Sequence, residues 1–134
     1  MVKWLTIIMI MFSLAIKAQE KIELEKRVNV NEVPKKAVKW LKDAYEKTRK
    51  FKWYYEETSG LRSYEAKFRY NNHLHSVEFD TGGVIQDIEI ALKWNELPEE
   101  VQQNIVHYMD STYHKYTIQK IQKQWTGKAD DLED

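Results

Sequence analysis

The chain has 134 residues, with 21 Lys plus Arg, 21 Asp plus Glu and no cysteine. This length fits one domain, and an apolar content of 43% with 13% aromatic residues excludes a disordered chain. The even charge balance excludes a strongly basic nucleic-acid binder, and the lack of cysteine excludes disulfides, thiol catalysis and a lipid anchor on a thiol.

The first eighteen residues have the pattern of an export signal. Lys3 gives a positive start, and residues 5–16 form a mostly apolar run that is shorter than the roughly 20 residues needed to span a bilayer. We therefore expect a secretory signal peptide, residues 1–18, cleaved after Ala18, with Ala15 as an alternative site.

Export sets the expected location and charge of the mature chain. Lys3 and Lys17 leave with the signal, so 21 basic side chains become 19 against 21 acidic ones, a formal charge of −2. We expect this chain in the periplasm or outside the cell, with no transmembrane segment after cleavage and with nucleic acid excluded as a partner.

Two amphipathic helices are expected, each beginning at an N-E-x-P motif. Asn31–Pro34 recurs as Asn95–Pro98, an offset of 64 residues. The apolar positions that follow match at the same offset and lie on one helical stripe: Val33 with Leu97, Ala37 with Val101, Leu41 with Ile105, Tyr45 with Met109. The pattern predicts helices over about 33–48 and 97–113, each with its proline in the first turn, and a degenerate internal repeat.

Strands are expected where apolar residues alternate with polar ones. A strand with apolar residues of one parity precedes the first helix, at about 22–30, and four consecutive antiparallel strands follow it. Asn71-Asn72 and Asp80–Gly83 are turn signals between these strands. A last strand with a bulge is expected after the second helix. The expected strands lie at 51–56, 64–70, 73–80, 84–92 and 117–124.

These elements predict an α+β domain. We expect an antiparallel sheet of five or six strands, with both helices on the face that carries Trp53, Phe68 and Phe79. Because the second helix returns the chain, we expect the last strand beside the first meander strand, with the N-terminal strand outside it. The domain covers residues 19–126, and an acidic flexible tail follows at 127–134.

The sequence resembles the PepSY-like family of exported bacterial proteins, which is similar in fold to the β-lactamase-inhibitor protein. The resemblance covers about residues 30–123 and is carried by short structural motifs: Val33–Val38, Phe51–Trp53, Tyr64–Phe68, Val77–Gly83 and Trp94–Pro98. It implies a non-enzymatic binding module outside the cytoplasm. No residues of an inhibitory loop can be transferred, because no such motif is present.

The outward face of the sheet is the candidate partner-binding surface. Its strand positions carry mixed charge and one tyrosine, as recognition surfaces do, although a solvated sheet face has the same pattern. The candidate residues are Lys52, Tyr54, Glu65, Lys67, Arg69 and Glu78. We expect an unknown protein partner in the cell envelope or outside the cell. Modulation or inhibition of an enzyme there is one form that such binding takes.

Other candidate sites are weaker. His73 and His75 share a strand face and could chelate a metal in a periplasmic small-ligand or metal-binding protein, the alternative function, but no metal-ligand motif supports them. The carboxylate pairs Asp87/Glu89 and Glu56/Glu57 are more simply solvated side chains. We therefore expect no catalytic residue, no metal and no cofactor.

The first predicted helix is strongly basic, whereas the second is more acidic. Lys35, Lys39 and Lys42 lie among its basic side chains, and Glu99 and Glu100 begin the second helix. The simplest interpretation is a pair of solvated helix faces, and the alternative is a patch that binds an acidic partner or an anionic surface.

Overall fold

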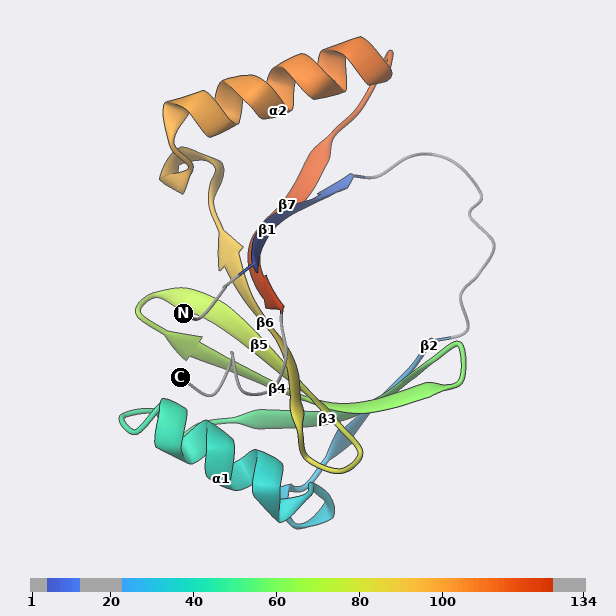
Figure 1. The fold of residues 1–134 in the computed structure, drawn as a ribbon, viewed down its shortest axis with the longest axis vertical. Coiled ribbons are helices and arrows are strands. Elements are labelled where there is room, and N and C mark those ends of the chain that lie inside the picture. The colour runs from blue at the N-terminus through green and yellow to red at the C-terminus, as the bar shows by residue number, and fades with distance from the viewer. Residues whose placement is uncertain (1–4, 13–22, 127–134) are drawn as a thin grey trace.

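The computed structural model describes residues 5–12 and 23–126. Strands β2 to β7 form an antiparallel sheet of six strands, and β1 pairs with the outer edge of β7 as a seventh. The elements in chain order are β1 (Leu5–Phe12), β2 (Glu23–Val28), the 3-10 helix η1 (Val30–Glu32), α1 (Lys35–Ala44), β3 (Lys52–Thr58), β4 (Leu61–Tyr70), β5 (His73–Asp80), β6 (Ile85–Leu92), the 3-10 helix η2 (Trp94–Glu96), α2 (Glu99–Thr112) and β7 (Ile118–Thr126). Helix α1 lies near one end of the twisted sheet and α2 near the other (Figure 1).

The predicted α+β class and the four-strand meander are confirmed. Strands β3 to β6 pair antiparallel in sequence order. The hairpin between β4 and β5 turns at Asn71 and Asn72, whose φ angles are 50° and 62°. Asparagine tolerates this left-handed region, which a two-residue turn of this type requires at both central positions.

The predicted strand order is wrong at both ends of the meander. Strand β7 pairs with β6, not with β3, and β2 occupies the outer edge of β3. Consecutive elements usually lie side by side, and α2 returns the chain so that β7 lies directly beside β6. In the predicted order, the connection from β6 to β7 would have to cross the whole sheet. Strand β2 takes the β3 edge because Val28, opposite Trp53, packs against the α1 core.

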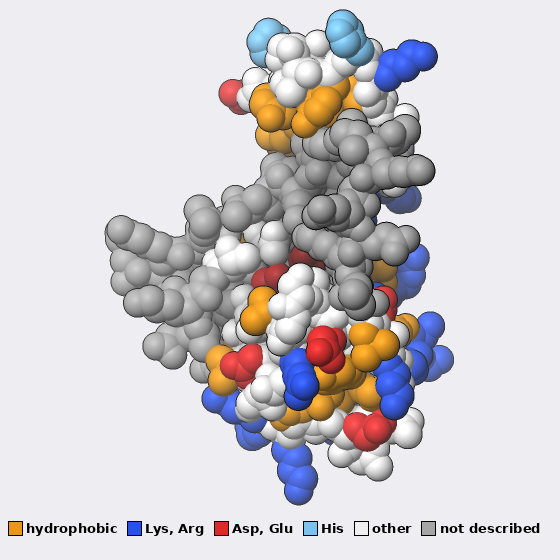
Figure 2. Space-filling model, turned by 90° about the vertical axis from the view of Figure 1, so that its right-hand side faces the viewer, with side chains coloured by type: hydrophobic (Ala, Val, Ile, Leu, Met, Phe, Trp, Pro, Cys, Tyr) orange, Lys and Arg blue, Asp and Glu red, His pale blue; other side chains and the backbone are white. Residues whose placement is uncertain are grey.

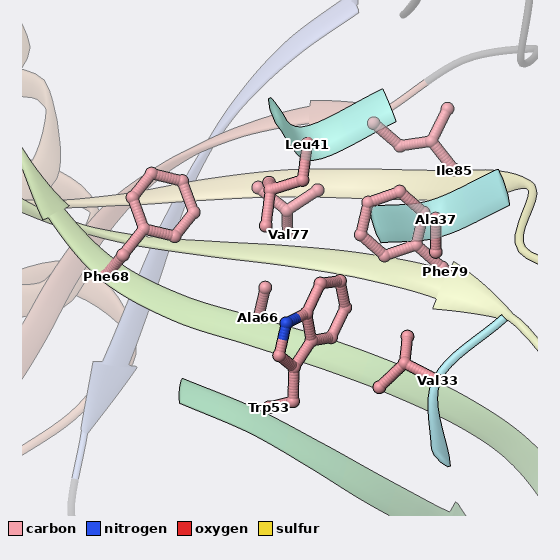
Figure 3. Packing of buried hydrophobic residues seen from close by; sticks show 9 residues of the cluster. All are labelled: Val33, Ala37, Leu41, Trp53, Ala66, Phe68, Val77, Phe79 and Ile85. Atoms are coloured by element: carbon pink, nitrogen blue, oxygen red, sulfur yellow. The ribbon is translucent and has the colours of Figure 1, made fainter. Parts of the chain in front are cut away.

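Both helices lie over the same face of the sheet, as predicted. In β5 and β6 the cross-strand pair Val77 and Ile88 belongs to the cluster beneath α1, and Ile88 is in turn opposite Trp125 of β7. On the same face Leu92 is opposite Ile121, which belongs to the cluster beneath α2. The larger cluster is shown in Figure 3 and contains nine buried residues, from Val33 directly after η1, from α1 and from β3 to β6.

The two helix starts have the same local structure. At both, a 3-10 turn is closed by a glutamate that accepts the backbone N–H three residues earlier, Glu32 from Asn29 at 2.7 Å and Glu96 from Lys93 at 2.9 Å. Both helices begin directly after the proline, so each proline precedes its helix and does not lie in the first turn. Helix α1 ends earlier than predicted because Tyr45 leaves the helical conformation, with φ −126° and ψ 61°.

Two predicted segments fall wholly or partly outside the described residues. The acidic tail, 127–134, lies outside them, as do residues 1–4 and 13–18 of the predicted signal peptide. Strand β1 lies within the predicted signal peptide. The structure is that of the uncleaved chain, which contains this segment whether or not the protein is exported. Export of the protein therefore stays a prediction. Among the described helices, none is long and apolar enough to cross a membrane.

Candidate functional site

The six predicted partner-binding residues lie on one face of the sheet, the face opposite the helices, which we call the polar face. The strand register aligns them in rows that run across the sheet. One row contains Tyr54, Glu65 and Glu78 in neighbouring strands, and the next contains Lys52 opposite Lys67. Arg69 continues β4 on the same face and is exposed, as is Lys52. The predicted set is therefore one contiguous surface on β3 to β5.

Tyr54 lies between two cations at the centre of this surface. Nζ of Lys67 is 4.7 Å from the ring centroid, and Cζ of Arg27 in β2 is 5.5 Å from it. A cation near an aromatic ring is attracted by the quadrupole of the ring. Lys67 also bonds Glu25 at 2.8 Å and lies 3.6 Å from Glu65. The ring of Tyr54 is thus flanked by two cations, one of which is itself paired with carboxylates.

A row of carboxylates runs from the centre of the polar face toward β7. Glu65, Glu78 and Asp87 are cross-strand neighbours in β4, β5 and β6. Burial and the nearby charge of Glu78 raise the pKa of Asp87 to about 7, although Gln124 Nε2 donates a hydrogen bond to Asp87 Oδ2 at 2.9 Å. Burial, followed by the charge of Glu65, also raises the pKa of Glu78. The sheet thus holds closely spaced acids that repel one another when ionised.

Glu56 and Glu65 form the tightest acidic pair. A hydrogen bond to Glu65, then burial and the neighbouring negative charges, raise the pKa of Glu56 well above its ordinary value. Burial alone would raise the pKa of Glu65, but its hydrogen bonds with Glu56 and Ser76 and the charge of Lys67 outweigh burial and lower it. Glu56 therefore keeps its proton more readily than Glu65, and the pair shares it.

One group of carboxylates among the described residues has metal-ligand spacing. Ligand oxygens of Glu25, Glu56 and Glu65 lie within 4.8 Å of one another. The ammonium group of Lys67 already contacts Glu25 and Glu65, so a bound cation would have to displace it. We therefore interpret this group as a charge network that Lys67 neutralises in part.

The predicted histidine pair is divided between two structural roles. His75 is buried, stacks on Phe68 and lies 3.4 Å from the hydroxyl of Tyr45, and burial lowers its pKa. His73 contacts the Glu96 carboxylate, and this bond raises the pKa of His73. Neither histidine belongs to a three-ligand group in the described part of the chain, so the structure gives no support to a metal site there.

The structure adds residues to the polar face that sequence reasoning did not place there. Glu25 and Arg27 join it because β2 pairs with β3, and only that pairing brings them to Tyr54 and Glu56. Asp87 and Glu89 do share this face, as their spacing predicts, but their main neighbours come from β5 and β7. Strand parity could have found the β2 residues once its partner strand was known.

The other carboxylate pair considered from the sequence, Glu56 and Glu57, is divided between the two faces of the sheet. Glu56 lies on the polar face, whereas the adjacent Glu57 points to the other face, where the hydroxyl of Tyr55 approaches it at 3.5 Å. Neighbouring residues in a strand point to opposite faces, so adjacency in sequence separates these two groups.

Comparisons with known proteins identify no relative. No family model matches the chain, and no curated protein or solved structure matches it. The PepSY-like resemblance therefore remains a prediction, and the site is interpreted from its geometry alone.

Proposed function

We propose that this chain is an exported, non-enzymatic binding module of the PepSY-like type, and that its polar face binds a protein partner in the cell envelope or outside the cell. One observation carries the proposal: the six candidate residues, chosen for their strand positions, form one surface around a tyrosine that two cations hold in place. An aromatic ring fixed at the centre of a polar surface is a common anchor of protein recognition.

The charges of this face indicate the chemistry of the partner. Glu65, Glu78 and Asp87 repel one another across neighbouring strands, and the raised pKa of Asp87 reflects that repulsion together with burial. A cationic segment of a partner, placed along this row, would favour the ionised carboxylates and relieve the repulsion. We therefore propose that the partner presents lysine or arginine side chains to this row.

A catalytic role is less well supported by the same geometry. A carboxyl group with a pKa of about 7 could transfer protons, and Asp87 has this property. General acid–base catalysis also requires a pocket that positions a substrate, and Asp87 lies on a sheet face, where its interacting groups are other carboxylates and Gln124. Burial, followed by the charge of Glu78, accounts for the raised pKa of Asp87, so we propose binding and no catalysis.

Site-specific photocrosslinking tests the proposal in the native cells. A photoreactive phenylalanine analogue replaces Tyr54 on the polar face, and in a matched control it replaces Tyr108, which is 58% exposed on α2. We expect irradiation to give one defined adduct from position 54 that is missing from position 108. Mass spectrometry of the adduct then identifies the partner.

A charge variant tests whether the carboxylate row contributes to the binding. Glu78→Gln with Asp87→Asn should weaken retention of the identified partner and reduce its dependence on salt, because two attractive charges are lost. Glu99→Gln with Glu100→Gln makes the same charge change at the start of α2 and should leave binding unchanged. Equal adducts at positions 54 and 108, or full retention by the polar-face variant, would contradict the proposal.

A further inference from the structure

A groove on the other side of the sheet has properties that the polar face does not explain. It has a volume of about 480 Å³ and lies between η1 and α1. Its apolar lining consists of Val30, Val33 and Val38, and three lysines of its border are Lys35, Lys39 and Lys42. Val30 is 53% exposed, so the apolar lining of the groove reaches the surface. Figure 2 shows basic side chains around hydrophobic ones at this end of the molecule.

The lysines of the groove are only partly neutralised. Asp43 is the acidic residue of the lining, and it forms an ion pair with Lys39 at 2.7 Å. Within the described part of the chain, Lys35 and Lys42 have no ion-pair partner. The groove therefore combines an apolar floor with a net positive border, and its complement is an apolar side chain with carboxylates on both sides.

The spacing of the lysines fits an extended peptide. Lys35 and Lys42 are seven residues apart in a helix, which corresponds to roughly 10 Å along its axis. Five residues of extended chain cover a similar length, about 13 Å between the first and the last of them. A segment with one central apolar residue and acidic residues on either side would thus place its carboxylates along the lysine border.

The chain itself contains such a segment. Residues 130–134 read Asp-Asp-Leu-Glu-Asp, with Leu132 between two pairs of acidic residues. The segment follows β7, whose Trp125 packs against the same hydrophobic cluster as Val38 of α1. Leu132 is six residue steps beyond Thr126, and these steps reach roughly 20 Å when the chain is extended. Along the sheet, the four strand spacings from β7 to β3, the strand that follows α1, amount to about 19 Å.

We propose that the groove between η1 and α1 binds residues 130–134 of the same chain, with Leu132 over the three valines and the acidic residues along the lysines. This contact does not depend on the function proposed for the polar face, because it involves different residues on the opposite side of the sheet. It would neutralise the strongly basic helix with the most acidic stretch of the sequence.

A paramagnetic label tests this contact directly. Because the sequence has no cysteine, Ala129→Cys gives the purified chain a single site for a nitroxide label beside the acidic segment. We expect the label to cause a loss of amide NMR signal at Val30, Val38 and Lys42, and the loss should diminish as salt rises. Intact signals at all three positions would overturn the proposal.

Two charge-reversal variants show whether the lysines of the groove cause the contact. Lys35→Glu, Lys39→Glu and Lys42→Glu together should restore the lost signals. The matched control, Lys36→Glu, Lys47→Glu and Lys50→Glu, changes three lysines that do not line the groove and should leave the signal loss unchanged. Chemical shifts of the buried core confirm that both variants are folded. Equal restoration in the two variants, or in neither, would overturn the proposal.

Two further experiments test whether another copy of the chain or a membrane occupies the groove. Mixing the spin-labelled chain with an unlabelled ¹⁵N-enriched chain reveals contacts between copies, and signal loss in that mixture would overturn the assignment to the same chain. Vesicles containing anionic lipid are added to the chain with Asp130→Asn, Asp131→Asn, Leu132→Ala, Glu133→Gln and Asp134→Asn. If those vesicles shift the groove amides while these substitutions alone leave them unmoved, the groove belongs to a membrane contact and the proposal fails.

Discussion

The contact between the β5–β6 turn and α1 gives the sharpest structural prediction. Gly83 has a φ of +85°, and a Cβ added there would lie 3.0 Å from the backbone nitrogen of Ala37 and 3.0 Å from Cβ of Lys36. Both atoms belong to the first turn of α1, so a side chain at this turn cannot be accommodated without moving the helix. We expect Gly83→Ala to destabilise the domain and displace α1.

The size of the effect follows from two separate costs. A left-handed backbone conformation costs an alanine roughly 1–2 kcal/mol, and overpacking against a fixed helix turn adds typically about 1–3 kcal/mol. The total, roughly 2–5 kcal/mol, is a large share of the ~5–15 kcal/mol that stabilises an ordinary domain. Urea unfolding followed by circular dichroism measures the loss.

Gly60 separates the two costs. It has nearly the same φ, +80°, but no atom lies within 4 Å of the position that a Cβ would take. Gly60→Ala should therefore show the conformational cost alone, roughly 1–2 kcal/mol. If Gly60→Ala and Gly83→Ala lose equal free energy of unfolding, the close approach of the turn to α1 contributes nothing, and this account of how α1 is positioned is refuted.

Other predictions concern the core and the ionisable groups. Leu41→Ala should cost roughly 2–5 kcal/mol in urea unfolding because Leu41 is fully buried, whereas Tyr108→Ala, at an exposed site on α2, should cost little. Asp87→Asn should stabilise the domain by roughly 1–2 kcal/mol at pH 8. The full rise of about three pKa units would correspond to ~4 kcal/mol, but water reaches this face and reduces the effect. Below pH 7 the gain should shrink, because the folded wild-type protein then keeps the proton on Asp87; unfolding curves at pH 5 and pH 8 decide this, and an unchanged gain would contradict it. In an NMR titration His73 should change protonation above pH 6.5 and His75 below it. The contribution of His75 to the stability of the domain should therefore be lost as the pH falls below 6.5, and that of His73 as the pH rises above 6.5. Titration in the reverse order would contradict the two environments.

Much of the fold follows from local sequence signals. The meander was predictable because period-two alternation and turn residues such as Asn71-Asn72 act over short range. The sheet edges were not predictable in the same way, since placing β7 beside β6 depends on how α2 returns the chain and on β2 occupying the β3 edge. The periodicity of a single segment determines neither of these two conditions.

The sequence predicts which residues of β3 to β5 share the polar face, but it does not predict the electrostatics of that face. Strand parity alone placed Tyr54, Glu65 and Glu78 on one face, and the structure aligns them in one row. Parity does not give the row its electrostatic character, which arises when pairing across three strands brings Asp87 beside Glu78. A surface that is merely solvated gains nothing from such a row, because like charges in neighbouring strands are destabilising. The crowding of half-buried carboxylates beside a tyrosine held by cations is therefore a cost to the folded state. A cationic partner would offset that cost, and for this reason we propose that the polar face binds one.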